Sequence, residues 1–222
     1  MDYYGPTYQA GVVDIPGSTE NFTSGNQSAI IPSLAIRYQD FLFTGSYFTK
    51  QNYGFTGSNG TPSTAKREET DMHFGYYVLP TLAVTLGYKE VKQDFTGKNY
   101  KYSGPIIGAA ASAPLTKGYS LYGNFGYGAL KAKFPVGFTD NTGHNGLDAD
   151  YYLGEIGIAY SFDIKATIPS AKALTATLGY RNQTLATKNF AVGITGSNPA
   201  LSRSTQLRDN TEGLALGLSV TF

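Results

Sequence analysis

The chain contains no cysteine. This absence excludes disulfide bonds, thiolate metal sites and cysteine nucleophiles together. Lysine and arginine form no cluster in the sequence and the formal net charge is only +1, which argues against a dedicated nucleic-acid-binding protein. No phosphate loop, dinucleotide fingerprint, zinc spacing or serine-hydrolase motif occurs in a fitting context, so no cofactor or metal is expected.

A long apolar run is also missing. A transmembrane helix needs roughly 18–20 consecutive apolar residues, and the longest candidate, residues 106–115, is short, rich in Gly and Ala, and interrupted by Pro114. The N-terminus has neither the basic nor the apolar region of a signal peptide. If the protein is exported, that peptide has therefore been removed. The mean hydropathy of −0.22 excludes a helical membrane protein but permits a barrel, in which only alternate residues face lipid.

The C-terminal segment, residues 209–222, shows a strict alternation. Small or hydroxylated residues occupy every second position of residues 213–222, and the chain ends on an aromatic residue. Because side chains in a strand alternate between two faces, this segment has one apolar face and one polar face. An apolar face can meet a second sheet or lipid, and a terminal Phe favours lipid. The apolar residues are Leu214, Leu216, Leu218, Val220 and Phe222.

The same alternation recurs along the chain, while helical periodicity is nearly absent. One face of most segments carries bulky apolar residues, and the other carries Gly, Ala, Ser, Thr and single charges. A soluble sheet would carry long charged side chains on its exposed face, so this pattern indicates a membrane barrel. The expected strands are 29–39, 41–54, 67–79, 81–95, 102–115, 119–133, 149–163, 172–186 and 209–222.

The connections between these segments alternate in length. Short links at 39–40, 79–81 and 116–118 and a moderate one at 164–171 alternate with longer polar segments. Those longer segments fall at 55–66, 96–101, 134–148 and 187–208. Transmembrane barrels have short periplasmic turns at one rim and longer external loops at the other. The lengths therefore support a single up-and-down antiparallel barrel domain over residues 1–222.

Strand parity predicts one more element. If the last strand ends at the periplasmic rim, residues 29–39 run back toward that rim and a strand must precede them. Residues 4–12 alternate suitably, with a loop at 14–28, which gives ten strands. The alternative is an eight-stranded barrel with residues 1–28 as a plug.

In these features the chain resembles bacterial outer-membrane β-barrel proteins. The matching features are the terminal segment 213–222, Tyr and Phe at strand ends, and the alternating loop lengths. The resemblance covers the whole chain and implies a location in the bacterial outer membrane, among its lipids. It also implies that the insertion machinery recognises the strand ending in Phe222 as an assembly signal.

Parity points a few charged residues toward the lumen. Arg37, Lys89, Glu155 and Arg181 are the predicted lumen-lining residues, with His73 less certain. We expect Glu155 and Arg181 to pair across one hairpin, because buried charges need partners. Arg37 and Lys89 would then leave the lumen mildly cationic.

These residues suggest a monomeric, narrow passive channel, or porin, for small solutes. The alternative is a non-conducting structural or surface-interaction barrel, which would be recognised by a lumen filled with side chains or by the N-terminal segment.

Two further patterns leave alternatives open. Asp148-Ala149-Asp150 and Asp71-Met72-His73 resemble the acidic pairs of omptins, the outer-membrane proteases, and would support a rim hydrolase. No catalytic residue is assigned, because loop carboxylates at a rim are ordinary. Pro32 and Pro105 fall inside expected strands, where they mark either β-bulges or a weak seam through which an apolar molecule could leave sideways.

Overall fold

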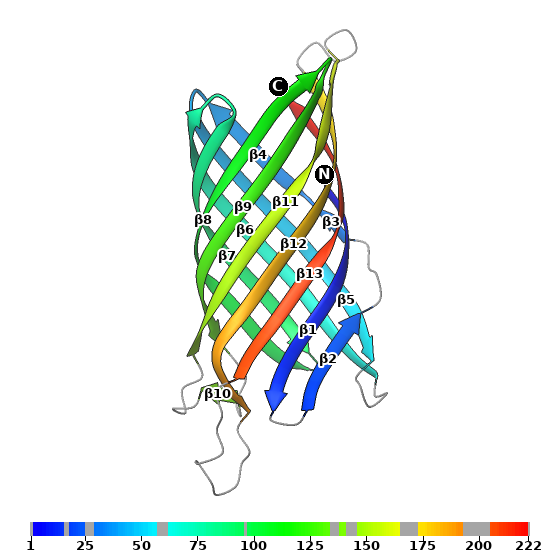
Figure 1. Cartoon of the computed structure of the whole chain (residues 1–222), viewed down its shortest axis with the longest axis vertical. Helices are drawn as coiled ribbons and strands as arrows, with labels where there is room; N and C mark the ends of the chain where they lie inside the picture. The colour runs from blue at the N-terminus through cyan, green and yellow to red at the C-terminus, as the bar shows by residue number, and fades with distance from the viewer. Residues whose placement is uncertain are drawn as a thin grey trace, which may run out of the picture.

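The computed structural model describes residues 2–15, 18–24, 29–56, 62–95, 97–133, 138–140, 146–164, 173–192 and 205–221. The regular elements of these residues are β-strands wound into a tall barrel (Figure 1). Within the same residues, no helix is long and apolar enough to span a membrane.

Long strands form most of the wall. The bounds are β1 (Asp2–Ile15), β2 (Ser18–Ser24), β3 (Ala29–Ile31), β4 (Ser33–Tyr38), β5 (Phe41–Thr56), β6 (Pro62–Leu79), β7 (Leu82–Phe95), β8 (Lys98–Thr116), β9 (Tyr119–Lys133), β10 (Phe138–Asp140), β11 (Gly146–Asp163), β12 (Ala173–Val192) and β13 (Thr205–Thr221).

The strands pair antiparallel in an order that closes on itself. From β5 to β13 each long strand pairs with its neighbour in sequence, apart from the short β10, which pairs with β12. β13 pairs with β12 on one side and β1 on the other. β1 in turn pairs with β2 and β3, while β2 and β4 pair with β5. The predicted up-and-down antiparallel barrel is confirmed.

The N-terminal residues belong to the wall. The backbone of β1 pairs with β13 from Asp2 to Ala10, so the described part of this segment is not a plug. The expected loop at 14–28 is wrong in part, because residues 18–24 form β2. β2, β3 and β4 follow one another between β1 and β5. The number of strands in the wall depends on whether these three segments are counted as one strand, so the predicted ten strands stay a prediction.

Proline and glycine shape the wall locally. Pro32 separates β3 from β4, and its carbonyl accepts a bond of 3.0 Å from the Tyr47 amide. Gly104 and Pro105 have no paired residue in the β8–β9 ladder, but the register is the same on both sides of them. The expected bulge at Pro105 is therefore wrong. In the β8–β9 turn Lys117 and Gly118 have φ of 40° and 88°, the left-handed pair that suits a two-residue hairpin.

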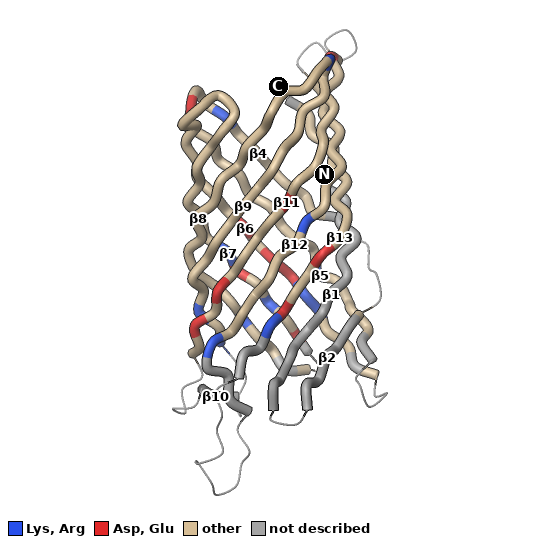
Figure 2. The backbone as a smooth tube through the Cα atoms, viewed as in Figure 1, with Lys and Arg blue, Asp and Glu red and all other residues tan. Residues whose placement is uncertain are grey.

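The polarity of the wall changes along the strands. The half near the short turns, which we call the short-turn half, exposes a belt of large apolar side chains on its outer face. The other half, which we call the long-loop half, carries most of the charged residues, as Figure 2 shows. On β11, for example, Ile156, Ile158 and Phe162 are exposed in the short-turn half, while Asp148 is exposed on the same outer face in the long-loop half.

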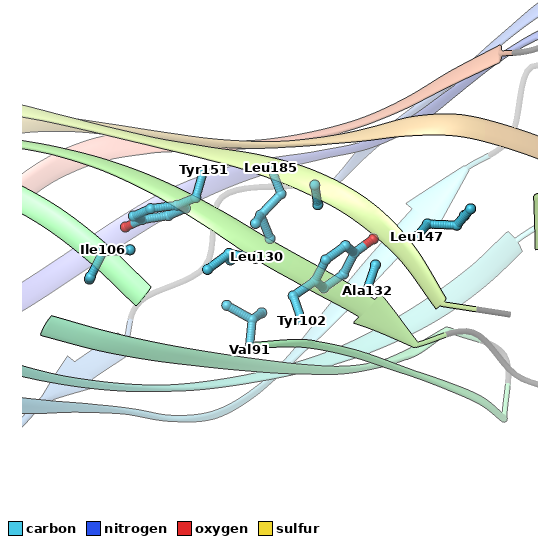
Figure 3. Close-up of a cluster of buried hydrophobic side chains, with 9 residues drawn as sticks. Val91, Tyr102, Ile106, Leu130, Ala132, Leu147, Tyr151 and Leu185 are labelled. Carbon is cyan, nitrogen blue, oxygen red and sulfur yellow. The ribbon is translucent and has the colours of Figure 1, made fainter. Parts of the chain in front are cut away.

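The interior of the long-loop half is packed. A cluster of buried apolar side chains fills it from β7, β8, β9, β11 and β12 (Figure 3). Large apolar residues inside and charged residues outside are the polarity of a soluble barrel. The cluster consists of Val91, Tyr102, Ile106, Leu130, Ala132, Leu147, Ala149, Tyr151 and Leu185.

The two halves should respond differently to the same substitution. Ile156, 62% exposed within the apolar belt, changed to Arg should lower the free energy of unfolding in lipid vesicles by about 2–4 kcal/mol, because the charge would enter hydrocarbon. Ser103, which faces outward in the long-loop half, changed to Arg should cost about 0–1 kcal/mol. Denaturant titration of both variants measures this, and equal losses would contradict the division of the wall.

Candidate functional site

A network of buried polar side chains lies inside the long-loop half of the barrel. β6 and β7 present them on the lumenal face at alternate positions, and β12 and β13 present others. Each of these side chains is buried, although the group contains five ionisable residues. The members of this lumenal network are Arg67, Glu69, Asp71, Lys89, Gln93, Gln183 and Asp209.

Two cations organise the network. Arg67 Nε lies 2.5 Å from Glu69 Oε1, and its Nη1 donates to both oxygens of Asp209 at 2.9 Å. Lys89 Nζ donates to Glu69 Oε2 at 2.7 Å and to the two oxygens of Asp71 at 3.0 and 2.9 Å. Glu69 therefore joins the two cations. Burial costs such charges several kcal/mol each unless partners and hydrogen bonds replace water, as they do here.

Neutral side chains extend the network. Gln183 Nε2 donates to Glu69 Oε1 at 2.6 Å, and Tyr151 donates from its hydroxyl to Gln183 Oε1 at 3.2 Å. Gln93 donates to Asp209. The ring of Tyr151 also lies beneath the Lys89 ammonium, with 4.7 Å between Nζ and the ring centroid, which adds a cation–π attraction.

These contacts cross the lumen. In the order of the sheet, β6 is separated from β13 by β5, β2 and β1 on one side and by β7, β8, β9, β11 and β12 on the other. The bonds from Arg67 to Asp209 and from Gln183 to Glu69 therefore join distant parts of the wall across the interior. The network and the apolar cluster both place buried side chains inside the long-loop half of the barrel.

A cavity of ≈ 340 Å³ lies in the lumen beside the network. Asp71 and Tyr151 line it from the network, and Arg181, Glu155 and His73 add polar groups. The Nδ1 atom of His73 makes no hydrogen bond to any residue that the structure describes. Small inward residues such as Ala110 and Gly126 leave the space open.

The four lumen-lining candidates have different surroundings. Lys89 is fully buried in the network. Glu155 and Arg181 are direct partners in the β11–β12 ladder, with 3.8 Å between Arg181 Nη1 and Glu155 Oε2. Arg37 is exposed in β4; its Nε donates to the Gln39 carbonyl at 3.1 Å, and its guanidinium lies 3.7 Å from the Tyr77 ring centroid. Phe222 lies outside the described residues.

Sequence reasoning missed half of the lumenal charge. The parity that turns His73 and Tyr77 inward, continued toward the start of β6, also turns Asp71, Glu69 and Arg67 inward. These acids offset basic residues in the described part of the lumen, and the expected mildly cationic lumen stays a prediction. The bases are Arg37, Arg67, Lys89 and Arg181, and the acids are Glu69, Asp71, Glu155 and Asp209.

The two omptin-like pairs do not meet. Asp71 and His73 face the lumen, whereas Asp148 and Asp150 face outward. Asp148 pairs with Lys131, and Asp150 pairs with Lys188 at 2.8 Å. They therefore cannot hold one water between them. In the part of the chain that the structure describes, no group of His, Asp and Glu is placed to hold a metal ion.

The network should dominate stability. Changing Arg67 to Met leaves Glu69 and Asp209 buried with too few partners, so the free energy of unfolding should fall by about 3–5 kcal/mol. Changing Lys131 to Met removes an exposed ion pair and should cost about 0–1 kcal/mol. Denaturant unfolding in detergent micelles compares the two; similar losses would mean that Arg67 is not essential to the packing.

Comparison with known proteins finds likeness in fold only. No family model and no curated protein matches the chain. Three similar solved structures are neisserial surface protein A (11% identity, 96% of this chain and 94% of that chain, TM-score 0.40), the Vibrio cholerae outer membrane protein OmpT (12%, 94% and 63%, 0.32) and the Pseudomonas putida toluene transporter TodX (9%, 97% and 88%, 0.32). These values carry no argument about function. The chain resembles bacterial outer-membrane β-barrels as a class, because its wall is an antiparallel barrel with an exposed apolar belt.

Proposed function

We propose that this chain is a bacterial outer-membrane barrel that is closed to ions at rest and that presents its long-loop half outside the cell as an interaction surface. The observation that carries the proposal is the lumenal network, in which Arg67 and Asp209 bond across the barrel. An open porin would need a continuous aqueous path at this level.

The change of polarity along the wall supports the placement of the two halves. The belt ends near Tyr127 and Tyr180, whose hydroxyls donate to Asp150 and Glu212 at 3.0 and 2.8 Å. Tyrosines with an apolar ring and a bonded hydroxyl suit a membrane–water interface. Beyond this level β6 continues from Thr70 to Pro62. At the usual rise and tilt of a barrel strand, this part of the wall is about 20 Å tall.

The direction follows from loop length. The short turns of the barrel lie at the same end as the C-terminus (Figure 1), and short turns are periplasmic in bacterial barrels. The long-loop half then extends beyond the outer leaflet. There its buried apolar cluster holds a rigid wall without support from lipid, which suits a surface for external partners.

A gated passage is the second candidate. The cavity of ≈ 340 Å³ beside the network favours it, because a shift of a few side chains would connect this space to the other side. In that case the network is a gate, and the channel is open only when Arg67 leaves Asp209.

Planar-bilayer recording tests closure. The unchanged protein should give no steady ion current, because desolvated charges and apolar side chains fill the lumen. A variant with Arg67, Glu69 and Asp209 all changed to Ala should give discrete current steps, since it removes the bonds that cross the interior.

The matched control changes Lys131, Asp148 and Asp150 to Ala. It removes one cation and two carboxylates, as the first variant does, but from the outward face. This control variant should give no ion current. Steady ohmic current through the unchanged protein would overturn the closed barrel, and brief openings would favour the gated passage.

The absence of cysteine makes orientation directly testable. A single cysteine replacing Lys131, which is exposed in the long-loop half, should react with a membrane-impermeant maleimide on intact cells. One replacing Lys117, in a short turn, should react only after the outer membrane is opened. The reverse pattern would contradict the proposed direction.

A further inference from the structure

Three lysines lie side by side on the outer face of the long-loop half. Lys92 of β7 is the direct cross-strand partner of Lys101 of β8, and Lys101 is the direct partner of Lys133 of β9. Their neighbours Val91, Tyr102 and Ala132 are buried inside the barrel, so the three ammonium groups point outward. We call Lys92, Lys101 and Lys133 the lysine row.

Such a row is unfavourable by itself. Like charges directly opposite one another in a sheet are destabilising, and the acidic residues that the structure describes compensate only part of the charge. Glu90 accepts from Lys92 at 3.1 Å and from Lys101 at 2.7 Å, and Glu68 lies 3.3 Å from Lys92. Lys133 has no acidic partner among the residues that the structure describes. An external anion would relieve the remaining repulsion.

The surface around the lysine row also carries positive charge. A hollow of ≈ 370 Å³ next to it is lined by the whole row and by Lys50 and Lys66, and it reaches Arg67 and Gln93 of the lumenal network. Its acidic lining residues are Glu68 and Asp94, fewer than its five lysines. Neither Lys50 nor Lys66 forms an ion pair with a described residue. The hollow is therefore a local site of positive charge on a chain whose net charge is close to zero.

The height of the row places it near the level of lipid headgroups. Lys92 lies four residues beyond Tyr88, whose ring is among the last exposed apolar groups of β7. At the usual rise and tilt this is about 10 Å above the apolar belt. Lipid headgroups lie at this level, and lysine stems can lie along the wall while their charges reach toward the interface.

We propose that the lysine row binds the phosphate groups of an outer-leaflet lipid. The inference rests on the proposed outward direction of the long-loop half. Ammonium groups bind phosphate as point charges, and the three strands hold them at fixed spacing. A lipid phosphate fits better than free phosphate because the three ammonium groups lie on the outer face of the wall, where a lipid headgroup can reach all of them.

Lipid retention in detergent tests the site. Purified barrel is mixed with a diphosphorylated glucosamine lipid, separated by gel filtration, and assayed for bound phosphorus by titration. A variant with Lys92, Lys101 and Lys133 changed to Gln should bind at least about ten-fold more weakly than the unchanged protein, since each lysine contributes to attraction of the headgroup. The binding of the unchanged protein should also fall as salt is raised.

The control changes Lys117, Lys188 and Arg208 to Gln, which removes the same charge from a short turn and from exposed positions of β12 and β13. It should retain binding. Equal loss in both variants would show a net-charge effect and overturn the site. So would equal binding of the dephosphorylated lipid, or displacement of the lipid by millimolar inorganic phosphate. Because neither variant alters the lumenal network, their conductance reports on the closed barrel separately.

Discussion

Closure of the backbone ladder is the constraint on which the rest of this structure depends. In hydrocarbon an unpaired amide or carbonyl costs several kcal/mol, so a membrane sheet must have no free edge. β13 pairs with β12 on one side and, from Asp209 to Gly217, with β1 on the other, so this length of the last strand has no free edge. Once the ladder is closed, the period of two assigns each residue of a strand to the lumen or to the outer face. Both the apolar belt and the lumenal network are consequences of that assignment.

A single strand in this barrel meets two solvents. Near the short turns, the outward positions of β11 hold Ile156 and Phe162, and the inward ones hold small or paired polar residues. Toward the long loops the same outward parity holds Asp148 and Asp150, and the inward parity holds Leu147 and Tyr151. The backbone geometry does not change at the boundary; only the medium outside does. The packed interior of the long-loop half gives that part a core of its own, as a soluble barrel has.

The sequence predicted those parts of the fold that local alternation encodes. Strict alternation predicted the strands of the apolar belt, and residues 119–133 agree with β9 at both ends. β2 was missed because its sequence, Ser-Thr-Glu-Asn-Phe-Thr-Ser, has the composition of a loop and becomes a strand by pairing with β1. The network was missed for a different reason. Arg67 and Asp209 are 142 residues apart, and only a closed wall brings them together, although parity alone already turned both inward.

The polarity boundary also has a kinetic consequence for assembly. In the proposed direction, the half of each strand that carries charged residues must cross the hydrocarbon layer before it reaches water. Lys66 and Glu68 on β6 would cross before the ladder around them is complete, and an unpaired charge at the bilayer centre is costly. The half of the barrel that holds the buried network is therefore the half whose insertion costs more free energy. The transfer of this half across the hydrocarbon layer, rather than the insertion of the apolar belt, should limit the rate of membrane insertion.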